Sequence, residues 1–262
     1  MTFFEIIILI VAGVLVGFIN TLAGGGSIIS LSLLMFMGLP ANVANGTNRI
    51  AIFLQTLTAT REFKKAGLLT SKKAYFLGIP AVFGSVVGSF IAIEINKELF
   101  EKVMVAIMVV MLFFIFYKPS VWLKGKQELL NKKSSWFQYL IFFFIGIYGG
   151  FIHAGIGYLL LISLVLGAGF DLLQANAVKT LIVLMFIPFS LLVFAFGGQI
   201  NYIYGLVLAI GNIIGAFVAS KFAVEKGANF VRWVILIVVI VTALHIFGLI
   251  DFGKIFTKIS LK

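Results

Sequence analysis

Two basic residues lie inside long apolar stretches, where a positive charge needs a partner. Arg49 is about nine residues into the segment 41–60, and Lys179 lies at a similar depth in the segment 172–196. A cation at such a depth costs about 2.5–3.5 kcal/mol on insertion scales, so both side chains are expected to face protein or water. Neither segment contains a carboxylate. The pair therefore favours an anion site, and the alternative is that both cations bond to backbone carbonyls or reach a membrane interface.

Side-chain amides accompany both cations. Asn45 precedes Arg49 by four residues, Asn176 precedes Lys179 by three, and Asn48 is the immediate neighbour of Arg49. Residues three or four apart lie on one face of a helix. The sequence therefore predicts a cation and an amide presented together in each half of the chain.

Two glycine-rich breaks interrupt the apolar sequence, at Gly24-Gly25-Gly26 and at Gly155-Ile156-Gly157. New helices are expected to start after them, at Ser27 and Tyr158. A helix N-terminus offers free N–H donors and a positive dipole end, which suits an oxyanion. The neutral donors expected beside the breaks are Asn20, Thr21, Ser27, His153 and Tyr158. His153 is expected either to carry a proton near neutral pH or to bond an unwound carbonyl.

The breaks are repeated in register, which indicates an internal duplication. A shift of 131 positions, without gaps from Ala23 to Val103, superposes the two copies. Broken apolar helices at matching points of two halves indicate a transporter binding site. The matches include Gly24 with Gly155, Gly26 with Gly157, Gly38 with Gly169, Asn45 with Asn176, Gly84 with Gly215 and Glu94 with Glu225.

Composition restricts the class of protein. Hydrophobic residues make up 62% of the 262 residues and charged residues 11%, which is typical of a polytopic membrane protein. There is no cysteine, so thiolate metal sites and cysteine nucleophiles are excluded. The net charge of +11 comes from short loops between apolar spans, so membrane orientation explains it better than nucleic-acid binding. Glu5 and the absence of a basic n-region favour a permanent first helix over a signal peptide.

The expected fold is all-α, with two five-segment repeats at 1–117 and 136–262 and a basic cytoplasmic linker at 118–135. Most segments approach the roughly 20 residues that cross hydrocarbon. The second segment of each half has only about a dozen residues and is expected to be short or re-entrant. The ten segments are expected at 3–22, 27–38, 41–60, 73–93, 98–117, 136–152, 157–169, 172–196, 202–222 and 230–249.

Basic loops predict the orientation. They lie between the third and fourth segments, between the halves, and between the ninth and tenth segments, whereas the loop GGQINY of the second half has no basic residue. Basic loops stay in the cytoplasm, which puts the N-terminus outside and inverts one repeat relative to the other. Lys254, Lys258 and Lys262 would then lie outside, against the rule.

Small residues at Gly84-x-x-x-Gly88 predict a close helix contact. Packing within the chain is favoured over a homodimer, which stays open. No nucleotide-binding loop, nucleophile motif or metal spacing occurs, so no enzyme activity, cofactor or metal is expected. The alternatives to a secondary transporter are an anion channel, an intramembrane enzyme with His153 as its base, and a scaffold without transport.

The runs at 17–27 (GFINTLAGGGS), 38–40 (GLP) and 44–49 (ANGTNR) resemble the sulfite exporter TauE/SafE family of membrane permeases. The second copy at 153–157 and Asn176 is similar to that family too. The resemblance covers essentially the whole chain and implies export or uptake of a small sulfur-containing anion such as sulfite, thiosulfate or a sulfonate. Under the shift His153 replaces Leu22 and Lys179 stands beside the place of Arg49, so equal roles for the two halves are in doubt.

The resulting hypothesis is a permease of the cytoplasmic membrane whose repeats rock to alternate access to an oxyanion near the midplane. Its partners are a small anion, the lipid bilayer and, through His153, a coupling proton. Replacing Arg49 with Ala is expected to abolish transport while leaving the protein folded. The residues expected to bind the substrate are Asn20, Thr21, Gly24, Gly25, Gly26, Ser27, Asn45, Asn48, Arg49, His153, Gly155, Gly157, Tyr158, Asn176 and Lys179.

Overall fold

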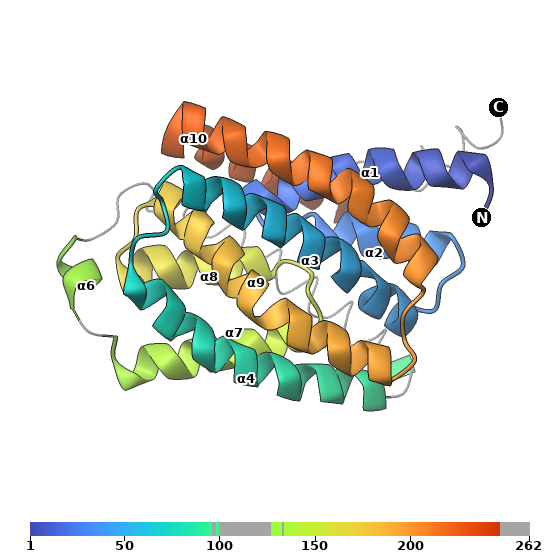
Figure 1. Cartoon of the computed structure of the whole chain (residues 1–262), viewed down its shortest axis with the longest axis horizontal. Helices are drawn as coiled ribbons and strands as arrows, with labels where there is room; N and C mark the ends of the chain where they lie inside the picture. Colours follow the sequence, from blue (N-terminus) through green and yellow to red (C-terminus); the bar gives the residue numbers. More distant parts are fainter. Residues whose placement is uncertain (96–97, 100–126, 133, 247–262) are drawn as a thin grey trace.

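The computed structural model describes residues 1–95, 98–99, 127–132 and 134–246, and every regular element within them is helical. The all-α class is therefore confirmed. Figure 1 shows the long helices lying side by side along one common direction. The elements are α1 (Phe3–Leu22), α2 (Ser27–Phe36), α3 (Ala41–Lys65), α4 (Lys72–Glu94), α6 (Gln127–Asn131), α7 (Trp136–Phe151), α8 (Ile156–Ile162), the π-helix η2 (Ser163–Ala168), α9 (Leu172–Phe196) and α10 (Tyr202–Ile246).

Four of the described helices are long and apolar enough to cross a membrane: α1, α4, α9 and the part of α10 up to Ile235. Their outward surface is apolar as well. On α4, Phe76, Phe83 and Phe90 recur every seven residues and are 56%, 65% and 49% exposed. Such an aromatic stripe suits lipid and would be unusual on a water-facing helix. The chain is a membrane protein with several apolar helices.

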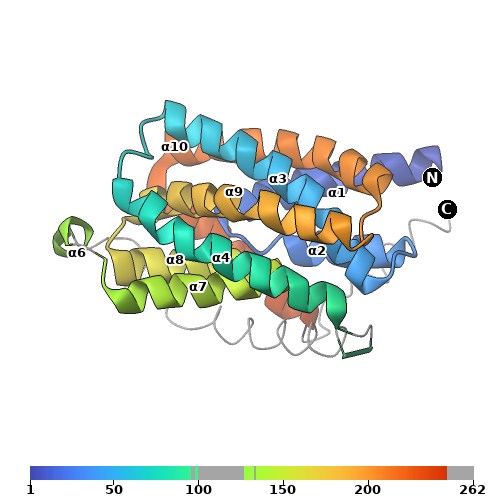
Figure 2. The ribbon, with the colours of Figure 1, turned by 60° about the horizontal axis from the view of Figure 1, so that its bottom comes forward.

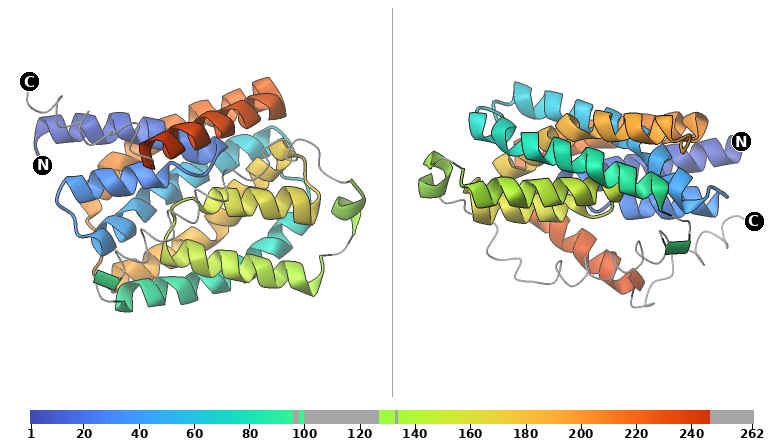
Figure 3. Two further views of the ribbon diagram at one scale, coloured as in Figure 1. Left: turned by 180° about the vertical axis from the view of Figure 1, so that it is seen from behind. Right: turned by 90° about the horizontal axis from the view of Figure 1, so that it is seen from below.

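Helix α10 reverses direction at Gly227, where φ is 71° and ψ is −168°. The rings of Phe222 and Phe230 lie 6.1 Å apart, centroid to centroid. Eight residues of straight helix would separate them by about 12 Å. Glycine adopts this positive φ without the steric cost that a Cβ imposes. The expected ninth and tenth segments, 202–222 and 230–249, are thus the two arms of α10, described as far as Ile246 (Figure 3).

Glycines bring two pairs of helices into backbone contact. Gly13 of α1 lies against Leu208 of α10, and Gly146 of α7 lies against Ala81 of α4. A Cβ added at either glycine would collide with the facing carbonyl oxygen. Close approach through small residues is the usual way in which membrane helices associate. The first helix of each half therefore packs on a late helix of the other half.

The Gly84-x-x-x-Gly88 pair takes part in this packing within the chain. A Cβ on either glycine would collide with backbone of α7, at Phe143 or Ile147. The interpretation as an internal packing face is correct. A homodimer remains a prediction, and these glycines do not support it because they pack within the chain.

The shift between the two halves is not constant along the chain. Thr2 and Ser135 open α1 and α7 with the same kind of capping box, and they are 133 positions apart. Gly38 and Gly169, which follow the short helices with φ values of 91° and 89°, are 131 positions apart. The first copy is therefore two residues longer between these points. The left-handed glycines of the breaks, Gly24 and Gly155, are also 131 positions apart, so the two extra residues lie before Gly24.

The short helices α2 and α8 do not reach across a membrane. Ten residues of helix span about 15 Å, half of the roughly 30 Å of hydrocarbon. Helix α2 begins at Ser27 as predicted, whereas α8 begins at Ile156, two residues before the expected Tyr158. Gly155, with a φ of 73°, allows this earlier start. Figure 3 shows α2 and α8 leaving the middle of the bundle in opposite directions.

The central helices α3 and α9 have 25 residues each and run antiparallel (Figure 2). Thr47, near the start of α3, accepts a hydrogen bond of 2.9 Å from the backbone of Asn201, which follows α9. Thr60, near the end of α3, bonds Thr180 near the start of α9 at 3.4 Å. These two contacts fix the relative direction of the helices. The buried polar run of the sequence therefore lies in the centre of the bundle.

Lys73, at the start of α4, connects several elements at one end of the bundle. Its Nζ donates to the carbonyl oxygens of Leu129 at 2.7 Å and Ala168 at 3.2 Å, so it links α6 to the end of η2. The expected fifth segment, 98–117, lies outside the described residues except for 98–99, and so does most of the linker 118–135. The described part of the linker thus sits beside the α3–α4 and η2–α9 turns.

Candidate functional site

The two glycine breaks touch each other at Gly24 and Gly157. A Cβ on either residue would collide with the Cα of the other. Gly24 also has a φ of 85°, which L side chains rarely adopt. The breaks therefore form one crossing point between the halves.

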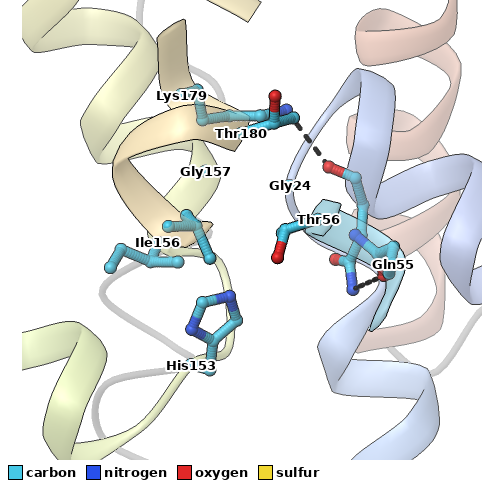
Figure 4. A pocket seen from close by; sticks show the side chains of 10 residues that line it. Gly24, Gln55, Thr56, His153, Ile156, Gly157, Lys179 and Thr180 are labelled. Carbon is cyan, nitrogen blue, oxygen red and sulfur yellow. Dashed lines mark hydrogen bonds between the residues drawn. The ribbon is translucent and has the colours of Figure 1, made fainter. Parts of the chain in front are cut away.

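A small cavity of about 20 Å³ lies at this crossing. A polar cavity needs about 10–15 Å³ to hold one water molecule, so a sulfite-sized ion would need the walls to move apart. Figure 4 shows Gln55 and Thr56 on one side, Ile156 on the other, and His153 and Lys179 at two ends. The lining residues are Asn20, Gly24, Gln55, Thr56, His153, Ile156, Gly157, Lys179, Thr180 and Val183.

Lys179 is the cation of this cavity. Its side chain is 2% exposed, and Nζ donates to Asn176 Oδ1 at 2.6 Å and to the carbonyl oxygens of Asn20 at 3.1 Å and Thr21 at 2.8 Å. Those carbonyls belong to the last turn of α1, whose C=O groups lack partners in their own helix. The ammonium therefore caps α1 and offers positive charge to the cavity. Among the described residues the cavity lining contains no carboxylate.

Arg49 has a related position at the end of α7, away from the cavity lining. Its guanidinium donates to the carbonyl oxygens of Gly149 at 3.1 Å and Gly150 at 2.7 Å, and Asn45 donates to that of Phe151 at 2.8 Å. The guanidinium also stacks 4.3 Å from the ring centroid of Phe194, and the residue is fully buried. Cations favour the negative end of a helix. Arg49 therefore bonds backbone carbonyls, which was the alternative to a direct contact with an anion.

Each of the two cations caps a helix that belongs to the other half of the chain. Arg49 of α3 caps α7, and Lys179 of α9 caps α1. Neither side chain points toward a membrane interface, because both are at most 2% exposed. Each half thus stabilises the broken helix of the other half. The halves cannot separate at these points without leaving buried carbonyls unbonded.

Asn20 joins the first break to the cavity. Its Oδ1 accepts from the Ser27 backbone N–H at 3.0 Å, which satisfies a donor at the start of α2. Its Nδ2 donates to Ser27 Oγ at 3.0 Å and to Gln55 Oε1 at 3.4 Å. The predicted free N–H at Ser27 is therefore already bonded in this conformation.

His153 stands at the other break. It is 6% exposed, and its ring lies 5.9 Å from that of Phe186. Within the described part of the chain its Nδ1 has no hydrogen-bond partner. In the 133-position register His153 corresponds to Asn20 rather than to Leu22. The two breaks thus present an amide and an imidazole at equivalent places.

Several buried polar atoms near the crossing lack partners among the residues that the structure describes. Such groups are rare in folded proteins and usually await a ligand, a water molecule or a movement. Tyr158 packs over Gly25 with its hydroxyl unbonded, and Asn48 accepts from Ser30 at 2.8 Å while its Nδ2 is unbonded. The unbonded atoms near the two breaks are Thr21 Oγ1, Asn48 Nδ2, Arg49 Nε, His153 Nδ1, Tyr158 Oη and Asn176 Nδ2.

The structure divides the predicted site residues into two groups. Asn20, Gly24, His153, Gly157 and Lys179 line the cavity together. The others form its surroundings: they cap helix ends, form the breaks or bond the lining residues. This surrounding group comprises Thr21, Gly25, Gly26, Ser27, Asn45, Asn48, Arg49, Gly155, Tyr158 and Asn176.

Comparison with known proteins assigns this arrangement to a family. The profile of the sulfite exporter TauE/SafE family matches residues 9–246. The chain belongs to the sulfite exporter TauE/SafE family. It is a membrane transporter, which agrees with the expectation that it is not an enzyme. No solved structure is matched.

Curated relatives of this TauE/SafE transporter have similar lengths. A "Probable membrane transporter protein" of Haemophilus influenzae is 27% identical over 230 residues, covering 88% of this chain and 89% of the relative. The "Probable membrane transporter protein ORF9" of Sinorhizobium sp is 26% identical, with 91% and 90% covered. The "Probable membrane transporter protein YfcA" of Escherichia coli K12 is 26% identical, with 88% and 85% covered.

The TauE/SafE cavity also contains residues that were not predicted as substrate ligands: Gln55, Thr56, Ile156, Thr180 and Val183. Gln55 and Thr56 follow Arg49 by about two helical turns on α3, and Thr180 is the neighbour of Lys179. Polar residues in an apolar helix next to a buried cation were the available signal. The apolar members carry no such signal, because only the fold brings them to the breaks.

Proposed function

We propose that this TauE/SafE transporter is a secondary carrier for a small sulfur oxyanion of the sulfite, thiosulfate or sulfonate type. The observation that carries the proposal is the Lys179 ammonium in the wall of a cavity between the two breaks. The described lining adds amides and hydroxyls and no carboxylate, so an anion is favoured over a cation. The family description, a sulfite exporter, supports the sulfur chemistry.

Alternating access is the second part of the proposal. The antiparallel α3 and α9 and the reciprocal contacts of α1 with α10 and of α7 with α4 support two inverted repeats. The cavity is smaller than the proposed substrate, which supports a closed state that must open to either side. We infer that opening moves the repeats against each other at Gly24 and Gly157.

Lys179 and Arg49 have different roles in this carrier. Lys179 lines the cavity and supplies the charge that meets the anion. Arg49 bonds three backbone carbonyls of α7 and positions the second break, so it is a positioning residue. Its Nε has no hydrogen-bond partner among the residues that the structure describes.

We also propose that the carrier lies in the cytoplasmic membrane with its N-terminus outside. Lys73 brings the α3–α4 turn, α6 and η2 to one end of the bundle, which supports one basic, cytoplasmic end. Gln199 donates to the carbonyl of Ile93 at 3.1 Å. The charge-free turn after α9 therefore lies beside the C-terminus of α4, at the opposite end of the bundle. His153, with its unbonded Nδ1, is the group proposed for a coupling proton.

Flux in proteoliposomes tests the proposal. Purified protein is reconstituted, and uptake of ³⁵S-sulfite, ³⁵S-thiosulfate and sulfoacetate is measured with the same anion inside or absent. A carrier gives saturable uptake that rises when unlabelled anion is present on the far side. Flux without this stimulation and far above carrier rates would favour an anion channel, and no oxyanion flux would contradict both.

A further inference from the structure

The amide of Gln55 is oriented by a chain of hydrogen bonds that begins at the first break. The Ser27 backbone N–H can only donate, and its partner at 3.0 Å is therefore Oδ1 of Asn20. Nδ2 of Asn20 then faces the other way and donates to the Gln55 side chain at 3.4 Å. The atom of Gln55 that accepts must be its oxygen. The main chain of the break thus decides which way the Gln55 amide points.

Asn212 of α10 reinforces the same orientation. Its Nδ2 donates to Gln55 Oε1 at 3.1 Å, and Asn212 itself is fully buried. Gly17 allows this contact, because a Cβ there would collide with the backbone of Asn212. One amide oxygen on α3 therefore receives donors from α1 and from α10. Three helices meet at that atom.

The Gln55 amide nitrogen is left for the cavity. Gln55 is 3% exposed and lines the cavity together with Lys179. Within the part of the chain that the structure describes, Nε2 donates to no protein atom, whereas both donors described above occupy Oε1. An N–H₂ group held in this way can donate to an anion and cannot accept from any ligand.

We propose that Gln55 is a substrate ligand of the carrier and that Asn212 is its positioning residue. This inference rests on the proposed transport of an oxyanion. Gln55 donates N–H to an oxyanion oxygen, and Lys179 supplies the charge. Asn212 never touches the substrate; it keeps the Gln55 oxygen turned away, so that the anion meets a donor rather than an acceptor. Fixing a ligand group before binding removes part of the entropic cost of ordering it.

The second half has no copy of this arrangement. The shift of 131 that holds for α3 and α9 places Phe186 opposite Gln55, and Phe186 contacts His153 through its ring. Ser85 takes the place of Asn212 in the packing, since Gly150 lies against Ser85 as Gly17 lies against Asn212. Within the described part of the chain, the Ser85 hydroxyl bonds only the carbonyl of Val82 in its own helix. The cavity therefore has an oriented amide donor on its α3 side, and Phe186 takes the equivalent position on α9.

A double-mutant cycle tests the proposal by measuring KM for ³⁵S-sulfite, ³⁵S-thiosulfate and sulfoacetate in proteoliposomes. Gln55→Leu removes the donor with little change in volume and is expected to raise KM about tenfold or more. Asn212→Leu removes only the positioning contact and is expected to raise KM about threefold to tenfold. Because Asn212 acts through Gln55, its substitution should have no further effect on KM in the Gln55→Leu background.

Thr58→Val on the same helix removes a hydroxyl that, among the described residues, bonds only Leu54 O and lies outside the cavity lining, so it should leave KM unchanged. Thermal unfolding identifies any variant that fails to fold, and Gln55→Glu, which replaces the donor by an acceptor, should then weaken transport more than Gln55→Leu. An unchanged KM in both Gln55 variants, or equal effects of Asn212→Leu in both backgrounds, overturns this inference alone. A wild-type protein without oxyanion flux overturns it together with the proposed function.

Discussion

Lys179 Nζ lies 2.8 Å from the carbonyl oxygen of Thr21, so a cation from the second half of the chain closes the broken helix of the first half. Arg49 does the same in the opposite direction at Gly150, 2.7 Å away. Both contacts use positive charge at the negative end of a helix dipole. Of the two cations, only Lys179 also lines the cavity. This difference predicts different results for substitutions at the two cations.

Substitution of Arg49 should affect stability first. Arg49→Leu leaves the carbonyl of Gly149 without its Arg49 donor, whereas that of Gly150 keeps the Ser89 hydroxyl at 3.1 Å. A buried carbonyl without a donor costs about 1–3 kcal/mol. This changes the result expected from the sequence alone, in which the protein stayed folded. Thermal unfolding in detergent should show a lower Tm for Arg49→Leu, a smaller loss for Arg49→Lys, and no loss for Arg61→Gln at an exposed position of the same helix. An unchanged Tm for Arg49→Leu would contradict the capping role.

Substitution of Lys179 should separate charge from capping. Lys179→Gln keeps N–H donors that can reach the carbonyls of Asn20 and Thr21, whereas Lys179→Leu keeps none. Both variants lack the charge and should lose at least about tenfold in oxyanion flux, since a hydrogen bond to a charged group is worth about 1.5–3 kcal/mol. Only Lys179→Leu should lose substantial stability. Flux that survives in Lys179→Gln would show that the ammonium does not bind the anion.

Much of the fold could be predicted because it depends on local sequence. The apolar segments and the helix start at Ser27 follow from hydropathy and from the glycine break. The start of α8 could not be placed, since the left-handed Gly155 and the glycine two residues later both permit a helix start. The two-residue difference between the copies was also hidden, because Gly24 falls on a glycine under either shift, on Gly155 with 131 and on Gly157 with 133.

The site could be predicted less well than the fold. Depth in an apolar segment identified Arg49 and Lys179, yet it could not tell a substrate ligand from a helix cap. That distinction depends on which main-chain oxygens lie within reach, and these come from residues 100 or more positions away. The role of Gln55 could not be predicted from the sequence for the same reason. Its role depends on Asn212, which is 157 positions away in the chain.

The crossing of the breaks gives a prediction about Gly157. Gly157→Ala places a Cβ against the Cα of Gly24, so the two breaks have to move apart. Overpacking of this kind costs about 1–3 kcal/mol, and here it acts at the proposed point of movement. Flux should fall about tenfold or more, with a lower Tm. Gly167→Ala is the matched control, because a Cβ there meets nothing within 4 Å. Equal flux in the two variants would show that the close contact has no role in transport.

The proposed inversion predicts opposite sides for two turns that the duplication makes equivalent. Thr70 and Tyr202 are exposed and follow α3 and α9, respectively, and the natural chain has no cysteine. Thr70→Cys and Tyr202→Cys can therefore be labelled in intact cells with a membrane-impermeant maleimide, each variant against the cysteine-free parent. With basic loops in the cytoplasm, Tyr202→Cys should react from outside and Thr70→Cys only after permeabilisation. Reaction of both cysteines from the same side would mean parallel repeats, and the reciprocal packing of α1 with α10 and of α7 with α4 would then need another explanation.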